Sequence, residues 1–431
     1  MSRYEQMTND QLLAEKEQLD RQYQNIKSKG LSLNMARGKP SSAQLDLSSE
    51  LLTNVGPEDL VAEDGTDARN YGVLAGLPEA KRLMAVMLDD DPENVIVCGN
   101  SSLNIMYDTV ARCWMFGTLG STPWCKLPAV KWLCPVPGYD RHFGVTEAFG
   151  IELIPVPMND NGPIMDEVER LAAADDAIKG IWCVPKYSNP SGITYSDDVV
   201  KRLAAMKTAA DDFRIFWDNA YSVHHLYDDP AQQDQLYDIA AACREAGTEN
   251  RYFKFASTSK VTFPGAGISA IAASPKNIAE IKQHMQPQTI GFDKINQLRH
   301  VKFLKDAEGI AAHMRKHAAL LRPKFELVQD TLEQELSDYG CSWSHPHGGY
   351  FVSFTGPEHT AKRIVSLCKE AGVTLTGAGA TWPHKNDPYD SNIRIAPSLP
   401  PIEELHQALE VFVVCVKIAA IEAQLEPSSQ S

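Results

Sequence analysis

Long apolar runs are missing from the 431-residue sequence, and even its most apolar segment, residues 409–425, is interrupted by Glu410, Lys417 and Glu422. A helix that crosses a bilayer needs about 20 consecutive apolar residues, so the sequence excludes a membrane span. The first 20 residues alternate acids and amides and lack the apolar core of a secretory signal. We therefore expect a cytoplasmic protein with no membrane partner.

Basic residues and paired cysteines are also scarce. The chain has 41 Lys and Arg against 56 Asp and Glu, and its net charge of −15 repels polyanions, so nucleic acid is not an expected partner. The nine cysteines form no C-x-x-C pair, which predicts reduced and mostly buried thiols. The histidines at 224–225 and 345–347 lack the spacing of metal ligands, so no metal site is expected.

Seven short apolar runs between residues 95 and 272 are typical of buried β-strands. Stretches with helical periodicity separate them, for example residues 104–115, 165–174 and 197–208. This alternation predicts an α/β fold with a mainly parallel, doubly wound, seven-stranded sheet. The predicted strands are residues 95–98, 131–135, 151–156, 181–185, 214–218, 252–256 and 267–272.

The segments on either side of the sheet predict a second, smaller α+β unit built from both termini. Polar residues at 8–10 predict the start of a leading helix that ends near Gly30, and a loop follows over residues 31–48. The C-terminal pieces are a helical run over 300–337, strand-like pieces at 350–354 and 392–395, and a helix from residue 402.

We therefore divide the chain into three parts. Residues 1–54 form an N-terminal segment that packs on the small domain, residues 55–299 a large domain, and residues 300–431 a C-terminal small domain. The polar tail at 426–431 is expected to be disordered.

Two glycine motifs resemble nucleotide-binding sites but lack the required context. Gly265-Ala-Gly267 fits a loose dinucleotide pattern, yet it follows Pro264 and precedes a strand instead of opening a helix. Gly38-Lys39 resembles the end of a phosphate-binding loop, yet Pro40 replaces the hydroxyl residue that binds magnesium. We therefore expect neither a nicotinamide or flavin site nor a nucleoside triphosphate site.

Four other segments place polar side chains in or after apolar strands. Each has an ordinary structural explanation: Asn189 lies in a turn, and Asp218 can cap a helix. Lys260 can be solvated, and Arg394 can be the partner in an ion pair.

Taken together, the four segments fit one cofactor. A lysine with a lowered pKa forms a Schiff base with an aldehyde, and an aspartate at a strand end can hold a protonated pyridine nitrogen. Asn189 and Tyr221 can bind a ring oxygen. Their combination predicts a pyridoxal phosphate enzyme.

The order and spacing of these motifs resemble the fold type I pyridoxal-phosphate aminotransferases of class I/II over nearly the whole chain. The sequence is most similar to the subgroup that contains the aminotransferase domains of MocR-type regulators and a set of bacterial aspartate aminotransferases. Residues 36–40 and 296–300 carry this narrower resemblance.

The resemblance implies catalytic and ring-binding roles. Lys260, in the motif Ser257-Thr-Ser-Lys, would form the internal aldimine and shuttle the proton between Cα and C4′. Asp218 would pair with the pyridinium, while Asn189 and Tyr221 would bind the phenolic oxygen. Tyr139 would stack on the face of the ring.

The resemblance also implies a phosphate site and a dimer whose subunits share their active sites. Asn100, Ser101 and Ser102 occupy the family's phosphate loop before a helix, where free N–H groups favour a dianion. Ser257 would add a hydroxyl. Tyr71 matches a tyrosine that reaches the phosphate of the neighbouring subunit, so a homodimer with shared active sites is implied.

For the substrate, the resemblance implies that Arg394 binds the α-carboxylate and that Asn189 and Gly38 also contact it, with Gly38 on a mobile segment that closes over it. The implied reaction is a ping-pong transfer of an amino group between an amino acid and a 2-oxo acid. The first expected pair is aspartate or glutamate with 2-oxoglutarate or oxaloacetate. Arg37, Lys39, Arg141, Lys294 and Arg299 are all candidates for binding a second carboxylate.

One position departs from the family. An arginine that grips the cofactor phosphate usually follows the lysine motif, but this chain has Gly267 there. We expect either weak cofactor retention, which an added arginine would correct, or a replacement Lys or Arg within hydrogen-bond reach of the phosphate.

Two alternatives remain open. A β-lyase on the same fold begins with the same lysine chemistry, so the motifs do not distinguish it. The ligand-sensing half of a transcription regulator is a remote alternative, because the residues before the sheet contain no basic recognition helix.

Overall fold

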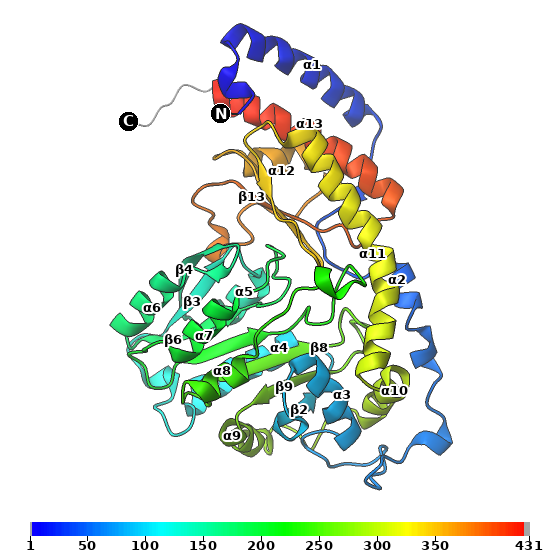
Figure 1. Cartoon of the computed structure of the whole chain (residues 1–431), viewed down its shortest axis with the longest axis vertical. Coiled ribbons are helices and arrows are strands. Elements are labelled where there is room, and N and C mark those ends of the chain that lie inside the picture. Colours follow the sequence, from blue (N-terminus) through cyan, green and yellow to red (C-terminus); the bar gives the residue numbers. More distant parts are fainter. Residues whose placement is uncertain (1, 426–431) are drawn as a thin grey trace.

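An eight-stranded sheet lies at the centre of the protein, whose computed structural model describes residues 2–425 (Figure 1). All seven predicted strands are present, and the two-residue β5 adds an eighth at one edge. β9 runs antiparallel to both of its neighbours and β5 antiparallel to β4, while the other pairs are parallel. The order is β2 (Val95–Cys98), β9 (Ser269–Ala273), β8 (Tyr252–Ser257), β7 (Arg214–Asp218), β6 (Ile178–Cys183), β3 (Lys131–Val136), β4 (Glu152–Asn159) and β5 (Gly162–Pro163).

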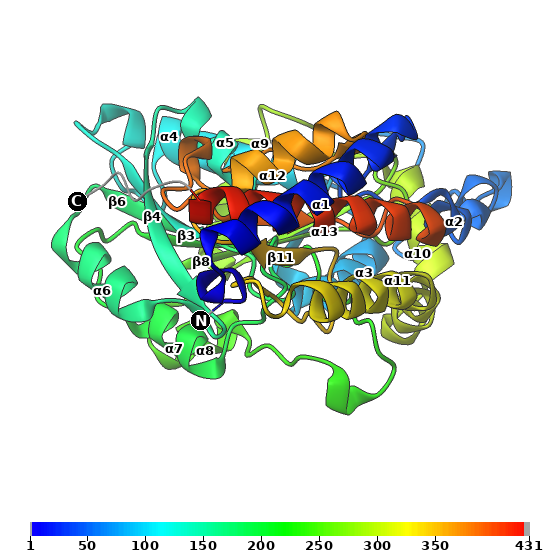
Figure 2. The same ribbon diagram turned by 90° about the horizontal axis from the view of Figure 1, so that it is seen from above.

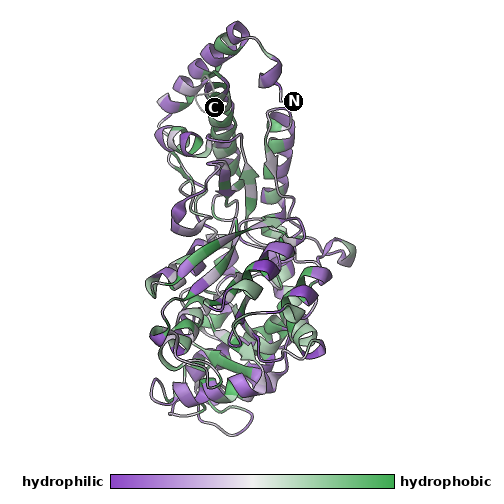
Figure 3. Ribbon diagram, turned by 90° about the vertical axis from the view of Figure 1, so that its left-hand side faces the viewer, coloured by the Kyte–Doolittle hydropathy of each residue, from purple (hydrophilic) through white to green (hydrophobic). Residues whose placement is uncertain are grey.

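Helices cover both faces of this sheet, which is why its inner strands are apolar on both sides. Alternate residues of one strand enter different cores: Ile96 packs with one set of helices and Val97 with the other. The first face carries α4 (Ser102–Phe116), α5 (Asp140–Ala148) and α9 (Pro275–Met285). The second carries α3 (Pro78–Leu88), α6 (Met165–Ala174), α7 (Asp197–Ala205), α8 (Ile239–Glu245) and α10 (Lys294–Leu304). Figure 3 shows hydrophobic strands between more polar helices. The predicted doubly wound α/β fold is confirmed.

A smaller unit lies at one end of the sheet and contains segments from both ends of the chain. Its core joins the antiparallel strands β10 (Ser342–Trp343), β11 (Val352–Thr355) and β13 (Asn392–Ile395) to four helices. These helices are α1 (Asn9–Ser28), α11 (Ala307–Leu336), α12 (Ala361–Glu370) and α13 (Ile402–Leu425). Figure 2 shows α1 lying along α13. The domain limits at residues 54 and 299 stay a prediction.

Local sequence explains the start of α1. Thr8 accepts a hydrogen bond from the Gln11 backbone N–H at 3.4 Å, and the Gln11 side chain accepts one from the Thr8 backbone N–H at 2.8 Å. This reciprocal capping box satisfies two N–H groups that the helix cannot bond internally. The helix ends at Ser28, close to the predicted end at Gly30.

Two expected segments differ from the structure. The predicted helical run over 300–337 is two helices, because Lys305 has a left-handed φ of 65° and Asp306 caps α11. The predicted loop over 31–48 contains β1 (Leu33–Asn34), paired in parallel with β12 (Val373–Thr374), and the short helix α2 (Ser42–Asp46). These elements are too short to show a hydrophobic period. The expectation for the tail at 426–431 lies outside the described residues.

Candidate active site

Polar residues converge where the parallel strands end. Tyr139 follows β3, Asn189 follows β6, Asp218 ends β7 and Ser257 ends β8. The carboxyl edge of an open α/β sheet is where such folds bind ligands. A cavity of about 130 Å³ at this edge is lined by eight of the predicted residues. They are Ser101, Ser102, Tyr139, Asn189, Asp218, Tyr221, Ser257 and Lys260.

Lys260 presents its amine to this cavity among aromatic rings. Its Nζ lies 5.5 Å from the ring centre of Tyr221 and 5.7 Å from that of Tyr350. Burial lowers the pKa of Lys260, and the negative charge of Asp218 opposes this effect in part. The neutral amine, which is the nucleophilic form, is therefore more populated than in a solvated lysine.

Asp218 has one carboxylate oxygen available to a ligand. Its Oδ2 lies 2.9 Å from Nε2 of His142, whereas Oδ1 is buried and has no hydrogen-bond partner among the described residues. The side chain is 3% exposed, so an unpaired carboxylate oxygen there is costly. A protonated pyridine nitrogen would satisfy Oδ1, and the residues present therefore fit pyridoxal phosphate.

His142 is a site residue that the sequence did not reveal. It lies in the first turn of α5, and its ring stacks on Trp182 with centroids 4.5 Å apart. This stacking fixes the ring that holds Asp218. The only signal in the sequence was a histidine three residues after Tyr139, because the partner carboxylate is 76 positions away.

Tyr221 and Tyr139 complete the walls of the cavity in which the cofactor ring is expected. Burial raises the pKa of Tyr221 well above its usual value, so its hydroxyl remains a hydrogen-bond donor at neutral pH. Burial likewise raises the pKa of Tyr139 to about 12. The Tyr139 ring lies edge-on to His142, with centroids 4.9 Å apart.

Arg394 joins the small unit to the cavity. From the middle of β13, its Nη1 donates to Oδ1 of Asn189 at 3.1 Å and lies 3.3 Å from Oδ1 of Asp140. Its guanidinium lies over the ring of Phe351, 4.8 Å from the centroid, and its Nε has no partner among the described residues. A buried arginine with a free donor is suited to a carboxylate.

Gly38 reaches the site through Phe351. It is outside the lining of the cavity, but a Cβ atom at this position would lie 2.3 Å from Cζ of Phe351. Only a glycine therefore permits this close approach of the N-terminal segment to the ring beneath Arg394.

The phosphate side of the cavity consists of hydroxyls and a helix start. Ser101 is the N-cap of α4, and its side chain makes no capping bond, so the first N–H groups of the helix remain available. Oγ of Ser257 donates to Oγ of Ser259 at 3.0 Å. Asn100 lies outside the cavity lining, and its amide donates to the Pro264 carbonyl at 3.1 Å.

No arginine replaces the missing one at Gly267 among the described residues that line the cavity, where Lys260 is the sole basic side chain. A Cβ at Gly267 would lie 2.7 Å from Oγ1 of Thr258 and 3.0 Å from the Phe263 carbonyl. An arginine introduced there would push against the lysine loop, and the expectation that it tightens cofactor binding stays a prediction. Arg112 lines an adjacent cavity of about 200 Å³ that shares Ser101.

Tyr71 is not brought into the site of its own chain. Its side chain is 81% exposed, and Tyr71 does not line the cavity. The loop that carries it contacts the start of α10, because the Lys294 ammonium donates to the Gly72 carbonyl at 3.2 Å.

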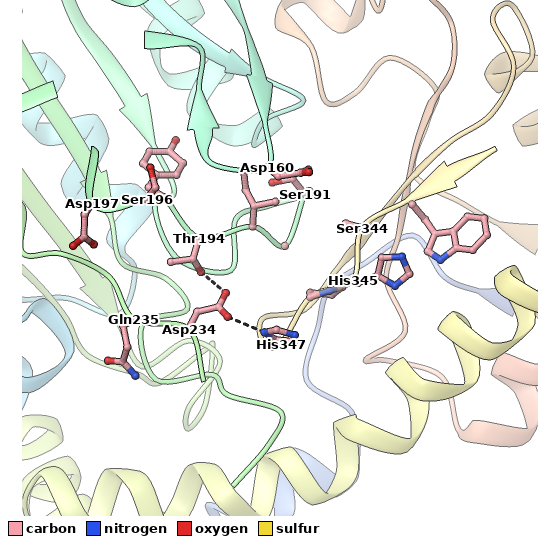
Figure 4. Close-up of a pocket in the computed structure, with 15 residues that line it drawn as sticks. Asp160, Ser191, Thr194, Ser196, Asp197, Asp234, Gln235, Ser344, His345 and His347 are labelled. Atoms are coloured by element: carbon pink, nitrogen blue, oxygen red, sulfur yellow. Dashed lines mark hydrogen bonds and ion pairs between the residues drawn. The ribbon is translucent and has the colours of Figure 1, made fainter. Parts of the chain in front are cut away.

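A separate cavity of about 590 Å³ lies between the turn after Asn189 and the small unit (Figure 4). Asp234 connects its two sides: Thr194 donates to its Oδ2 at 2.7 Å, and Nδ1 of His347 lies 2.9 Å from its Oδ1. This cavity contains none of the predicted catalytic residues, so size alone does not identify the reactive site.

The described part of the chain contains no helix long and apolar enough to cross a membrane. Within residues 2–425, no group of three or more His, Cys, Asp or Glu side chains is arranged to hold a metal ion.

Comparisons with known proteins agree with this geometry. An aspartate aminotransferase of Corynebacterium glutamicum is 48% identical over 408 residues, which cover 94% of each chain. The crystal structure of an aspartate transaminase from the same species matches with a TM-score of 0.95 and 46% identity, covering 98% of this chain and 99% of that chain. An α-aminoadipate aminotransferase from Thermus thermophilus, solved with a phosphopyridoxyl-leucine compound, shares the fold at a TM-score of 0.70 and 19% identity, covering 93% and 95% of the two chains.

The family described as aspartate amino-transferase matches residues 7–427, nearly the whole chain. The predictions of an aminotransferase and of pyridoxal phosphate as cofactor are thereby confirmed. The roles predicted for individual residues stay predictions, although the structure gathers most of them in one cavity. With this match and a 48% identical relative, the chain belongs to the aspartate amino-transferase family.

Proposed function

We propose that the protein transfers the amino group of aspartate or glutamate to a 2-oxo acid, with 2-oxoglutarate and oxaloacetate as the acceptors. The observation that carries the chemistry is the free Oδ1 of Asp218 in the same cavity as the amine of Lys260. The choice of a dicarboxylic substrate is supported by relatives named aspartate aminotransferase and aspartate transaminase.

Each residue has a defined task in this proposal. Pyridoxal phosphate supplies an aldehyde for the substrate amine and a ring that accepts the electrons of the Cα–H bond. Lys260, as a neutral amine, moves the proton between Cα and the cofactor carbon. Asp218 keeps the ring nitrogen protonated, Arg394 binds the α-carboxylate, and the Asn189 and Tyr221 side chains orient the ring oxygen.

The second carboxylate of the substrate requires another cation. Of the five candidates, Arg37 and Lys39 flank Gly38 on the segment that packs on Phe351. The ammonium of Lys294 is already bonded to the Gly72 carbonyl. Arg141 and Arg299 are the two other candidates.

The proposal extends to assembly, subgroup and location. Tyr71 and Ile290 are 81% and 60% exposed, and their loops adjoin at Gly72 and Gly291, which supports a homodimer that covers them. A cytoplasmic location and membership of the MocR-type subgroup remain proposals that rest on the sequence motifs.

A panel of amino acids with 2-oxoglutarate as acceptor tests the function. We expect aspartate to be the preferred donor and to convert the bound cofactor to its amine form in stoichiometric amount. Release of pyruvate and ammonia would instead show a β-lyase. Equal rates with apolar amino acids would contradict the dicarboxylate assignment but not the transamination.

The cofactor attachment has its own test. Borohydride treatment of the yellow holoenzyme should fix the cofactor on Lys260, as peptide mass spectrometry would show. A label on another lysine, or a colourless protein after reconstitution, would exclude the role of Lys260.

A further inference from the structure

A buried group of polar side chains contacts the backbone immediately after Lys260. His313 and His317 lie one turn apart on α11, and Gln44 lies on α2. Their exposed fractions are 5%, 1% and 0%. Because buried polar groups are costly when unpaired, the positions of their hydrogens can be deduced from their partners.

The hydrogen-bond partner of His313 determines which of its ring nitrogens carries the hydrogen. Its Nε2 lies 2.7 Å from the carbonyl oxygen of Val261. A carbonyl only accepts hydrogen bonds, so Nε2 of His313 carries the hydrogen and donates it. The hydroxyl of Ser48, 3.3 Å from the same nitrogen, can then act only as an acceptor of that hydrogen.

The orientation of Gln44 fixes the hydrogen of His317. Oε1 of Gln44 accepts the Ser41 backbone N–H at 3.0 Å, as part of the capping box of α2. The amide nitrogen therefore faces Nδ1 of His317 at 3.2 Å and the Tyr350 hydroxyl at 2.8 Å. Nδ1 of His317 accepts, so the ring hydrogen is on Nε2.

Two imidazole N–H groups thus converge on one carbonyl. Nε2 of His317 lies only 3.1 Å from Nε2 of His313, beside the Val261 carbonyl that His313 bonds. A carbonyl oxygen has two lone pairs, so it can accept from both donors. Both rings are neutral, since burial lowers the pKa of His317 to about 3 and also lowers that of His313.

Other histidines hold the same segment from different elements. Nε2 of His224 lies 3.3 Å from the Lys260 carbonyl. Nδ1 of His300 donates to the Asn296 carbonyl, so its Nε2 accepts from the Thr262 hydroxyl at 2.9 Å. The carbonyl groups of Lys260 and Val261 and the hydroxyl of Thr262 are therefore held by side chains from outside the loop.

We propose that Gln44, His313 and His317 are positioning residues for Lys260. The inference rests on the proposed function, in which the Lys260 amine must move a proton at one substrate atom. The lysine side chain is flexible, so the direction in which it leaves the backbone determines where its amine can reach. The same Gln44 amide holds Tyr350, whose ring lies beside that amine, and it connects the lysine loop to the N-terminal segment.

The first test uses the cofactor-free protein and His313→Leu, which removes the donor to Val261. We expect hydrogen exchange of the amides in residues 258–268 to become about tenfold faster or more, since Val261, Thr262 and Ile268 donate their N–H groups to Thr258. His313→Gln, which places an amide donor near the position of Nε2, should restore slow exchange. Val328→Ala, a buried change further along α11, is the control for general destabilisation.

The second test uses the holoenzyme. His313→Leu should lower the half-transamination rate by about tenfold or more while KM changes by less than about threefold, because misplacement of about 1 Å can cost 100-fold in rate. The absorption band of the lysine-bound cofactor should titrate at a different pH in this variant and at the original pH in His313→Gln. If His313→Leu does not fold, Gln44→Leu should show the same changes in weaker form.

Exchange and rates that match the wild type in His313→Leu or Gln44→Leu would overturn the proposal. Val328→Ala with the same local exchange and spectral changes would also overturn it, since the effect would then be general. If borohydride labels another lysine, the proposed function of Lys260 fails, whereas the exchange result still shows whether these residues hold the loop.

Discussion

At the residue scale, Lys254 and Lys260 are two lysines with opposite surroundings. Nζ of Lys254 lies 2.6 Å from Oδ1 of Asp238 and 3.2 Å from Oδ2 of Asp90. Lys260 has no carboxylate within 4.0 Å among the described residues, although Asp218 lines the same cavity. Lys254 is a structural ion-pair partner, whereas the amine of Lys260 has no such partner among the described residues.

This contrast predicts opposite effects of the same substitution in the cofactor-free protein. Lys254→Met should lower the free energy of unfolding by about 3–5 kcal/mol, because it leaves buried carboxylates unpaired. Lys260→Met should raise it at neutral pH. Burial places the folded pKa of Lys260 below the unfolded value of 10.5, so the cost of its charge is full below the folded pKa and disappears as pH rises toward 10.5.

Denaturant unfolding of both variants between pH 7 and pH 10 measures these effects. The stabilisation by Lys260→Met should shrink steadily toward about pH 10.5, the usual lysine pKa. If Lys260→Met destabilises the protein at pH 7, burial of the charged Lys260 amine does not destabilise the folded state.

Substitution of Asp218 should reduce the catalytic rate without loss of the fold. Asp218→Asn keeps the shape but removes the charge that holds the ring nitrogen protonated. The half-transamination rate should fall about 10- to 150-fold, which corresponds to the 1.5–3 kcal/mol of a charge-assisted hydrogen bond. Single-turnover absorbance kinetics measure it, with the exposed Asp211→Asn as control. A near-normal rate in Asp218→Asn would show that the charge of Asp218 on the ring nitrogen is not needed for the ring to accept electrons.

At the element scale, the N-terminal segment acts on the substrate site through a packing contact. Gly38→Ala would place a methyl group against the ring of Phe351, which must then move from beneath Arg394. We expect KM for the amino acid to rise about tenfold, with a small effect on the absorption band of the lysine-bound cofactor.

A matched variant separates this effect from a general cost of alanine. Gly144 in α5 is exposed and has no atom within 4 Å of an added Cβ, so Gly144→Ala should leave the kinetics unchanged. An unchanged KM in Gly38→Ala would mean that Phe351 does not support Arg394.

The elements that the sequence predicts well are those with a long hydrophobic period or a complete cap. The strands of the large sheet and α1, with its Thr8 capping box, are of this kind. The two-residue strands β1, β5, β10 and β12 have no period, so only tertiary contacts define them. Asp306 caps α11 inside the run predicted as one helix, and the left-handed Lys305 before it has no sequence signature.

The same distinction applies to the site. Lys260, Asp218, Asn189 and Arg394 could be predicted because each stands in a motif at or near a strand. His142 and His313 could not, because their partners are 76 and 52 positions away and the pairing depends on how the strands are ordered. Sequence motifs therefore reveal the candidate reactive groups more easily than they reveal the side chains that position those groups.

At the scale of the whole molecule, the exposed Tyr71 predicts that active sites are shared between subunits. Tyr71→Ala and Lys260→Ala should each inactivate the homodimer. After mixing and reassociation, about one quarter of the wild-type activity should return, because half of the dimers are hybrids with one intact site of two.

Activity of the mixed sample, with the dimer content measured by sedimentation, checks this prediction. If Tyr71 acts within its own chain, each hybrid still contains one subunit with only the Tyr71 change and one with only the Lys260 change, and no activity returns. A monomer at micromolar concentration would contradict the shared-site assembly directly.

Helix α11 has a consequence for how the protein unfolds. Its first half places Ile310 and Met314 in the core under the large sheet, and its second half places Phe325 and Val328 in the core of the small unit. With 30 residues it is about 45 Å long and continuous through both cores. Neither core can melt without removing packing partners from the other. The two units should therefore share one calorimetric transition, with equal calorimetric and van't Hoff enthalpies per cooperative unit, even though they look separate in outline.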